Sequence, residues 1–181
     1  MRIISGIYGK RRFDIPKNFK ARPTTDFAKE NLFNVLNNLI DWTEGPVALD
    51  LFSGTGSIGF EFLSRGCSKV VCVEKEAGHH AFIKKVAKEL KTNDLISIRG
   101  DAFTYLSGMR RPVDINFADP PYALSELSEI PDLIFSKKLL NENGWLILEH
   151  PSGHSFKKHP AFSQQRVYGS VNFSLFEMQS R

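Results

Sequence analysis

The sequence predicts an α/β protein with a doubly wound, mostly parallel seven-stranded sheet and a C-terminal antiparallel hairpin. Short apolar runs alternate with segments of helical periodicity between residues 47 and 149, which is typical of a parallel sheet covered by helices on both faces. The length of 181 residues suits one domain, and 41% hydrophobic and 24% charged residues suit a folded core. Two β-prone stretches flank Gly169-Ser170 and predict the hairpin within residues 164–178.

The elements before this hairpin follow from apolar periodicity. A first helix is expected after Pro23 with a threonine as its N-cap, because Ala28, Leu32 and Leu36 follow at helical spacing. Apolar runs predict strands at residues 47–52, 69–74, 95–99, 113–118 and 145–149. Further helices are expected between the first two strands as far as Gly66, over residues 77–91, and within residues 125–140.

The basic charge of the chain is concentrated at its start. Residues 1–22 hold seven basic side chains against one acidic, a net charge of +6, whereas the other 159 residues hold 17 basic and 19 acidic. We therefore divide the chain into a basic N-terminal arm or hairpin, residues 1–22, and a main domain, residues 23–181. Such an arm is suited to bind a polyanion, although a solvated basic tail has the same composition.

Composition also excludes several classes of protein. No apolar run approaches the roughly 18 residues that span a bilayer, and the first residues lack the apolar core of a signal peptide. Cys67 and Cys72 match neither a metal-binding nor a redox spacing, which predicts free thiols. No metal site is expected from the five histidines, of which His79 and His80 are expected at a helix surface. We expect a cytoplasmic monomer that does not bind membranes.

A glycine loop follows the strand at residues 47–52. Residues 54–59 read Gly-Thr-Gly-Ser-Ile-Gly, where glycines permit a tight turn and the next helix offers backbone N–H groups to a ligand. Glu74 ends the next strand, twenty residues after Gly54, and its carboxylate could accept both hydroxyls of a ribose. The pattern predicts a nucleotide-like ligand, with a role in packing alone as the alternative.

Two aspartates help to identify the expected ligand. Asp50 lies four residues before Gly54, where a carboxylate would repel the pyrophosphate of a dinucleotide but suits the cationic methionine end of S-adenosylmethionine. A carboxylate at a strand end could also simply cap a turn. Asp101, after the third strand, could accept from the adenine amino group beside the backbone N–H of Ala102, or act as the N-cap of residues 102–107.

The most specific motif is Asp-Pro-Pro-Tyr at residues 119–122, directly after the fourth strand. Two prolines fix the backbone and remove two donors, so local carbonyls become acceptors. Hydrogen bonds from an exocyclic amine to Asp119 and to the Pro120 carbonyl would expose the nitrogen lone pair, and Tyr122 could stack on an extruded base. The first and fourth strands flank the switch point of a doubly wound sheet, so Asp50 and Asp119 are expected beside one crevice.

These motifs resemble the class I S-adenosylmethionine-dependent methyltransferases, and more narrowly the RsmD-like 16S rRNA (guanine-N2)-methyltransferase family. The narrower resemblance covers nearly the whole chain and includes Arg-Pro-Thr-Thr-Asp at residues 22–26 and Leu-Phe-Asn at residues 32–34. Phe27 and Lys29 depart from the arginines of many relatives. The resemblance implies a Rossmann-like fold, S-adenosylmethionine as cofactor, and ribosomal RNA or the assembling small ribosomal subunit as partner.

The resemblance also assigns the site residues. Those expected at the reacting amine are Asp119, Pro120, Pro121 and Tyr122. Those expected to bind the cofactor are Asp50, Phe52, Ser53, Gly54, Thr55, Gly56, Glu74, Lys75, Asp101 and Ala102. Those expected to contact nucleic acid are Arg2, Lys10, Arg11, Arg12, Arg22 and Thr24. Two alternatives stay open: a DNA adenine-N6 methyltransferase, because Asp-Pro-Pro-Tyr does not select the base, and a catalytically silent RNA-binding protein.

Overall fold

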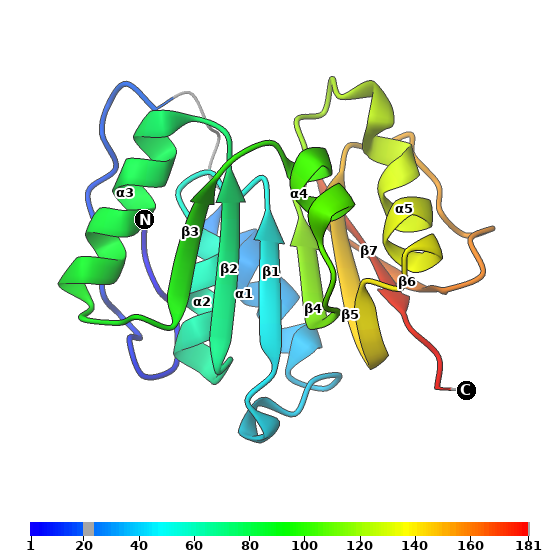
Figure 1. The fold of residues 1–181 in the computed structure, drawn as a ribbon, viewed down its shortest axis with the longest axis horizontal. Helices are drawn as coiled ribbons and strands as arrows, with labels where there is room; N and C mark the ends of the chain where they lie inside the picture. The colour runs from blue at the N-terminus through cyan, green and yellow to red at the C-terminus, as the bar shows by residue number, and fades with distance from the viewer. Residues whose placement is uncertain (20–23, 181) are drawn as a thin grey trace.

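The protein forms a seven-stranded sheet with helices on both faces (Figure 1), in a computed structural model that describes residues 1–19 and 24–180. The strands are β1 (Val47–Leu51), β2 (Lys69–Glu74), β3 (Leu95–Arg99), β4 (Val113–Ala118), β5 (Leu140–His150), β6 (Phe162–Tyr168) and β7 (Val171–Glu177). The α-helices are α1 (Asp26–Leu36), α2 (Ser57–Arg65), α3 (Ala77–Glu89), α4 (Ala102–Gly108) and α5 (Ile130–Ser136). Two 3₁₀ helices, η1 (Trp42–Glu44) and η2 (Ser125–Glu129), complete the described elements.

The strand order is β3-β2-β1-β4-β5-β7-β6, which confirms the predicted fold class. The first five strands of this order are parallel, and β7 pairs antiparallel with both β5 and β6. The chain moves outward from β1 to β3 and then returns to place β4 against the other side of β1. This reversal makes the boundary between β1 and β4 the switch point of the sheet.

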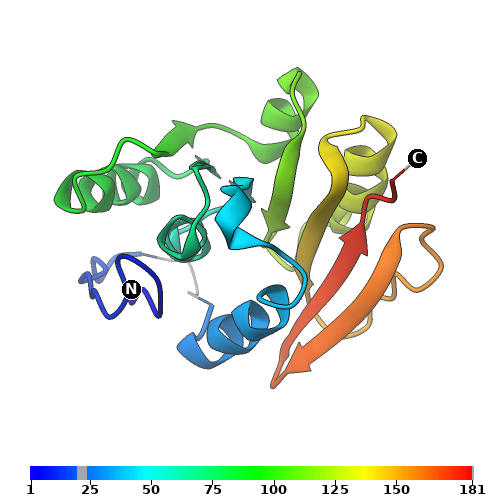
Figure 2. The ribbon, with the colours of Figure 1, turned by 90° about the horizontal axis from the view of Figure 1, so that it is seen from below.

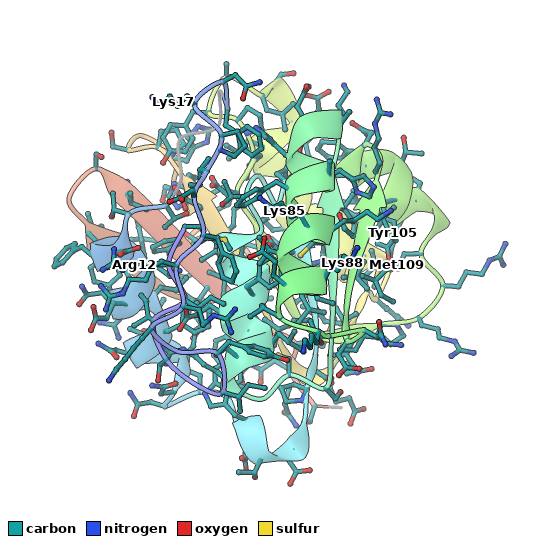
Figure 3. The ribbon with its side chains drawn as sticks, turned by 90° about the vertical axis from the view of Figure 1, so that its left-hand side faces the viewer. Arg12, Lys17, Lys85, Lys88, Tyr105 and Met109 are labelled. Atoms are coloured by element: carbon teal, nitrogen blue, oxygen red, sulfur yellow. The ribbon has the colours of Figure 1, made fainter. Side chains whose placement is uncertain are left out.

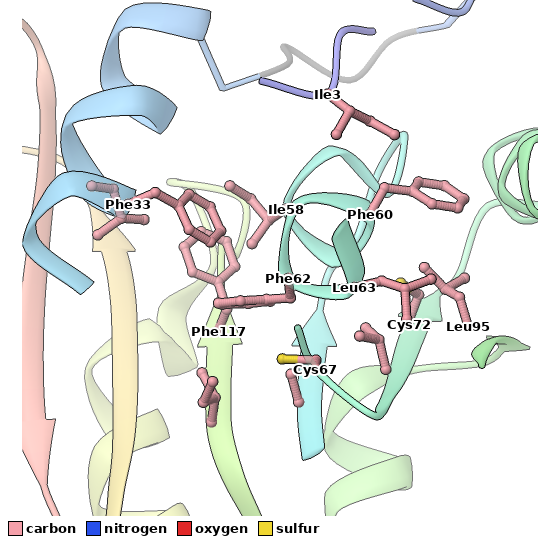
Figure 4. Close-up of a cluster of buried hydrophobic side chains, with 14 of the residues drawn as sticks. Ile3, Phe33, Ile58, Phe60, Phe62, Leu63, Cys67, Cys72, Leu95 and Phe117 are labelled. Atoms are coloured by element: carbon pink, nitrogen blue, oxygen red, sulfur yellow. The ribbon is translucent and has the colours of Figure 1, made fainter. Parts of the chain in front are cut away.

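Helices cover the sheet in two layers, which Figure 2 shows end-on. α1, α2 and α3 bury Leu32, Phe60 and Ile83 against one face. Figure 4 shows part of this cluster, including Phe60. α4 and α5 bury Leu106 and Ile130 against the other face. Because both faces are covered, the central strands are mostly apolar, with the buried Asn116 of β4 as an exception, and their ends offer polar side chains to a ligand.

The N-terminal arm lies along α2. Ile3 and Phe13 are buried in the same cluster as α1 and α2, and Arg2 and Arg12 form an antiparallel bridge. Gly6 has a φ of 84°, and a Cβ there would lie 1.8 Å from the Ser64 carbonyl oxygen, so this approach requires glycine. The predicted loop or small hairpin is therefore anchored to the domain by backbone contacts as well as by apolar burial.

Three local features differ from the expectations. β5 begins at Leu140 rather than at residue 145, because turn-forming residues at 141–144 are accommodated by an irregularity in its pairing with β4. The helix expected within residues 125–140 is divided into η2 and α5. His79 is buried, not at the surface, because the ring of Phe19 packs 4.4 Å from its own.

None of the helices in the described ranges has the length and apolar composition that crossing a bilayer would require.

Candidate active site

The two main motifs of the sequence meet at the C-terminal ends of β1 and β4. The glycine loop follows β1, residues 119–122 follow β4, and these two strands are hydrogen-bonded neighbours. The backbone N–H of Asp119 donates to the carbonyl of Leu51 at 3.4 Å, so the two connections start side by side. Both strands end at the upper edge of the sheet in Figure 1. Doubly wound sheets bind their ligands at this kind of edge.

The glycine loop makes a tight turn into α2. Gly54 and Gly56 have φ values of 54° and 76°, which favour glycine, and the Gly56 N–H donates to the Ser53 carbonyl at 2.7 Å. Gly56 is the N-cap of α2 and supplies no side-chain hydrogen bond. The nine-residue helix thus begins at the switch point with its positive dipole end and backbone N–H groups beside the loop. Thr55, within the loop, is buried.

Asp50 is a buried carboxylate beneath the first turn of α2. It is 1% exposed, and its Oδ2 accepts from the Gly59 N–H at 3.0 Å. Burial raises the pKa of Asp50 to about 8, although the Gly59 hydrogen bond opposes the shift. A Cβ on Gly59 would lie 2.4 Å from the Cys72 sulfur and 3.1 Å from Asp50, so glycine is needed for this packing.

Glu74, at the end of β2, supports the glycine loop from the side. Its Oε2 accepts from the Gly54 N–H at 2.7 Å, and its Oε1 accepts from the Glu76 N–H at the same distance. These bonds fix the carboxylate next to the loop, where the ribose contact is predicted. Lys75, the following residue, is exposed.

The end of β3 leads directly into α4. Asp101 is the N-cap of this helix and accepts from the Thr104 N–H at 2.9 Å, which confirms the capping alternative of the sequence analysis. Ala102 is buried behind it. The rings of Phe52 and Phe103 lie 6.1 Å apart and form an apolar wall between this strand end and β1. Asp101 can cap the helix through one oxygen and still offer the other to a ligand.

Residues 119–122 form the corner after β4. Asp119 keeps part of its surface accessible and Pro120 is buried, whereas Pro121 and Tyr122 are exposed. Burial raises the pKa of Asp119 well above its usual range, and the negative charges of Glu149 and Asp50 raise it further. The Pro121 carbonyl accepts from the Leu124 N–H at 2.9 Å, which closes the turn. The corner therefore combines a carboxyl group of raised pKa with an exposed aromatic ring.

Glu149 belongs to this corner and was missed by the sequence analysis. It lies on β5, is 5% exposed, and accepts from the Tyr122 hydroxyl at 3.1 Å and from the Thr24 hydroxyl at 3.4 Å. The available signal was its position at the end of the fifth apolar run, where a parallel strand next to β4 must end beside Asp119. Thr24, expected at RNA, thus bonds a carboxylate of the site in this structure.

The basic residues of the arm have different surroundings. Lys10, Arg11 and Arg12 are exposed. Arg2 lies 3.6 Å from Asp26 in a partly exposed ion pair. Arg22 lies outside the described residues.

Two pockets lie on the described surface, and neither is lined by residues 54–56 of the glycine loop or by residues 119–122. One of about 350 Å³ lies between the arm, the start of α1 and Ser57 of α2, and Arg2 and Arg12 are part of its lining. The other, of about 720 Å³, lies between α4 and α5, and Phe103 is part of its wall.

A loop of nucleotide-binding type next to a corner that can orient an amine is the arrangement of class I S-adenosylmethionine-dependent methyltransferases, and fold and site assign the chain to this class. A family model described as "Conserved hypothetical protein 95" matches residues 1–177. The chain belongs to this family, and the resemblance to RsmD-like methyltransferases is confirmed.

Named relatives and a solved structure agree with this assignment. "Ribosomal RNA small subunit methyltransferase D" of Haemophilus influenzae is 33% identical over 183 residues, which cover 98% of this chain and 93% of the relative. The protein of the same name from Buchnera aphidicola is 31% identical over 149 residues, 82% of this chain and 75% of the relative. The solved structure of yhhF from Escherichia coli has a TM-score of 0.87 at 27% identity and covers 100% of this chain and 99% of that one.

Proposed function

We propose that this protein transfers a methyl group from S-adenosylmethionine to the exocyclic N2 amine of a guanine in small-subunit (16S) ribosomal RNA. The observation that carries the proposal is the adjacency of Asp119 to the glycine loop across the switch point, where its N–H bonds the Leu51 carbonyl. The names of the relatives from Haemophilus influenzae and Buchnera aphidicola support ribosomal RNA as the substrate class. We expect a monomer acting in the cytoplasm on this RNA or on an assembling subunit.

The chemistry of the site fits the proposed cofactor. The start of α2 suits its carboxylate, Asp50 suits its ammonium group, and the carboxylate of Glu74 suits its ribose hydroxyls. Phe52, Ser53 and Thr55 complete the loop, while Lys75, Asp101 and Ala102 border the predicted adenine end. A pyrophosphate would lie near the acidic side chain of Glu74, whereas the cationic methionine end of S-adenosylmethionine would favour the charged form of Asp50, so a dinucleotide fits less well. When bound, S-adenosylmethionine supplies an activated methyl group.

The residues of the corner would orient the accepting amine. An exocyclic amine is a poor nucleophile because its lone pair is delocalised into the ring. Hydrogen bonds from its N–H groups to Asp119 and to the Pro120 carbonyl would favour a pyramidal nitrogen, while Pro121 holds the corner rigid and Tyr122 stacks on the base. The proton leaves after methyl transfer, when the nitrogen is strongly acidic, so no dedicated base is required. Catalysis here is positioning and electrostatics.

The direct test is methyl transfer to RNA. Purified protein is incubated with radiolabelled S-adenosylmethionine and with 16S RNA or small subunits from cells that lack the enzyme, and the modified nucleoside is identified. We expect N2-methylguanosine at one position. Methylation of adenine N6 in duplex DNA instead would support the DNA enzyme, and RNA binding without transfer would support a silent binding protein.

The Asp119→Ala variant tests the assigned corner. Loss of the amine contact should lower kcat by about 100-fold or more, because misplacement of a reacting group has effects of this size. Affinity for S-adenosylhomocysteine, measured by calorimetry, should change little. Asp94→Ala, at an exposed loop position, is the matched control and should keep full activity. Normal turnover by Asp119→Ala, or loss of its cofactor binding, would contradict the assigned roles.

A further inference from the structure

Glu149 and Asp119 occupy equivalent positions on neighbouring parallel strands. The register pairs Ala118 of β4 with Leu148 of β5, so the next residues along the two strands are Asp119 and Glu149. Side chains at paired positions of adjacent parallel strands point to the same face of the sheet. Glu149 thus lies on the strand beside the proposed amine-orienting residue, and its charge raises the pKa of Asp119.

The Glu149 carboxylate is held beside the surface on which a base would stack. The Tyr122 hydroxyl donates to Oε1 at 3.1 Å, and the Thr24 hydroxyl donates to Oε2 at 3.4 Å. Tyr122 is 44% exposed even though its hydroxyl reaches this buried group. Since the two hydroxyl groups bond different oxygens, both oxygens of the carboxylate are oriented by hydrogen bonds. A base stacked on Tyr122 would therefore present its edge to two carboxyl groups.

Guanine and adenine differ at the edge that these two groups would face. In guanine the N2 amine is next to N1–H, so two neighbouring positions donate hydrogen bonds. In adenine the N6 amine is next to an unprotonated N1, which accepts a hydrogen bond. A carboxylate beside the reacting amine therefore attracts the N1–H of guanine and repels the N1 lone pair of adenine. Specificity of this kind combines an attractive contact to one base with repulsion of the other.

We propose that Glu149 selects guanine by accepting a hydrogen bond from N1–H while Asp119 and Pro120 receive the N2 amine. This inference rests on the proposed function, which supplies the reacting amine, and it adds the choice of base that the Asp-Pro-Pro-Tyr motif leaves open. Asp119 can take part with its proton in place, because a protonated carboxyl group retains a carbonyl oxygen that accepts. Glu149 then supplies the acceptor oxygen that N1–H meets.

The test uses 2-aminopurine, which keeps the 2-amino group of guanine but has an unprotonated N1. Once the modified nucleotide is mapped, synthetic RNA is prepared with either guanosine or 2-aminopurine at that position. The wild-type protein is assayed for methyl transfer to each RNA, within reconstituted subunits if these are the substrate. We expect kcat/KM to be about 100-fold lower for 2-aminopurine, the size of one good base contact. Equal rates for the two bases would overturn the role of Glu149.

The Glu149→Gln variant completes the comparison. A glutamine can turn its amide to donate to an unprotonated N1, so the ratio of the two rates should fall to within about tenfold. Glu142→Gln, at an exposed position of the same strand, should keep the wild-type ratio. A purely structural role for Glu149 would lower both rates and leave their ratio unchanged, which contradicts the proposal. If Glu149→Gln does not fold, equal wild-type rates for guanosine and 2-aminopurine would still overturn the proposal.

The two hypotheses fail in different ways. Absence of methyl transfer to any guanine would reject the proposed function itself. Transfer to guanine N2 with no discrimination against 2-aminopurine would reject only the role of Glu149.

Discussion

Asp50 is the residue whose ionisation is most directly tied to the proposed cofactor. Its carboxyl group is enclosed below α2, and burial raises its pKa to about 8. Glu74 and Asp119 are acidic neighbours, and Glu74 raises the pKa of Asp50 further. At neutral pH the ligand-free protein therefore holds a proton on Asp50 most of the time. A cation placed beside this carboxyl group favours its charged form and expels the proton.

This linkage predicts how cofactor affinity depends on pH. Below pH 8, binding of S-adenosylhomocysteine, which carries the same ammonium group, should release a proton from Asp50. Affinity should then rise with pH, by at most about tenfold per unit, and level off above pH 8. Calorimetry in two buffers of different ionisation enthalpy measures the released proton. Asp50→Asn should abolish the release while Asp94→Asn retains it. Proton uptake on binding by the wild-type protein would contradict the prediction.

The individual site residues were predictable to different degrees. The glycine loop and the corner at Asp119 were found because each combines a local motif with a strand end, and the rule for parallel sheets places strand ends together. Glu149 carries no motif. Its partners Tyr122 and Thr24 are 27 and 125 residues away in sequence. Contacts of such separation exist only once the sheet has formed, so a pattern within one segment cannot reveal them.

Among the elements, α1 and α2 are connected by a buried ionic network. Lys29 of α1 is fully buried, donates to the Ser57 hydroxyl at 2.9 Å and to the Arg2 carbonyl, and lies 3.6 Å from Glu61 of α2. Glu61 also accepts from the N–H groups of Ile4 and Ser5 in the arm. Both helices and the arm are therefore held around one ion pair. Ser57 is the first residue of α2, so this network ends at the glycine loop.

Removing Lys29 should weaken the whole unit. Lys29→Met leaves the buried Glu61 without its lysine, although Arg65 still contacts it at 2.8 Å, and the free energy of unfolding should fall by about 3 kcal/mol. Urea denaturation measures this change. The control is Lys85→Met, because Lys85 is 70% exposed in its pair with Glu89 and should contribute less than about 1 kcal/mol. Equal stability of the two variants would mean that the network does not stabilise the fold.

Helix periodicity predicted the buried face of α1 except at this lysine. Ala28, Leu32 and Leu36 are buried as their spacing requires, and Thr25 caps the helix by accepting from the Ala28 N–H at 3.1 Å. Lys29 is on the same face, but its burial depends on the acidic partner that α2 supplies. Lys29 departs from the arginines of many relatives, which put an RNA contact at this position in doubt, and its full burial rules out direct contact in this conformation. Charge pattern alone could not distinguish a buried cation from an exposed one.

At the scale of the whole molecule, the exposed basic side chains of the N-terminal arm form a candidate surface for binding RNA. Lys10, Arg11, Arg12 and Lys17 are exposed, whereas the apolar residues Ile3 and Phe13 hold the arm to the domain. Figure 3 shows Arg12 and Lys17 on the side of the molecule where α3 presents Lys85 and Lys88. A strand of RNA that reaches the corner from the arm would pass the pocket of about 350 Å³ that Arg12 helps to line. Contacts of this kind add affinity without choosing sequence.

Charge reversal in the arm should therefore weaken RNA binding and reduce its dependence on salt. In Arg11→Glu/Arg12→Glu, the loss of two phosphate contacts should reduce the slope of log K against log salt by about 1.4, since each contact to a single strand contributes about 0.7. The matched control is Lys137→Glu/Lys138→Glu, which changes the net charge equally at exposed positions just before β5. Filter binding at several salt concentrations gives both slopes. If the slope of log K against log salt falls equally in the two double variants, the loss is due to net charge and not to contacts of the arm. The arm is then a solvated basic segment.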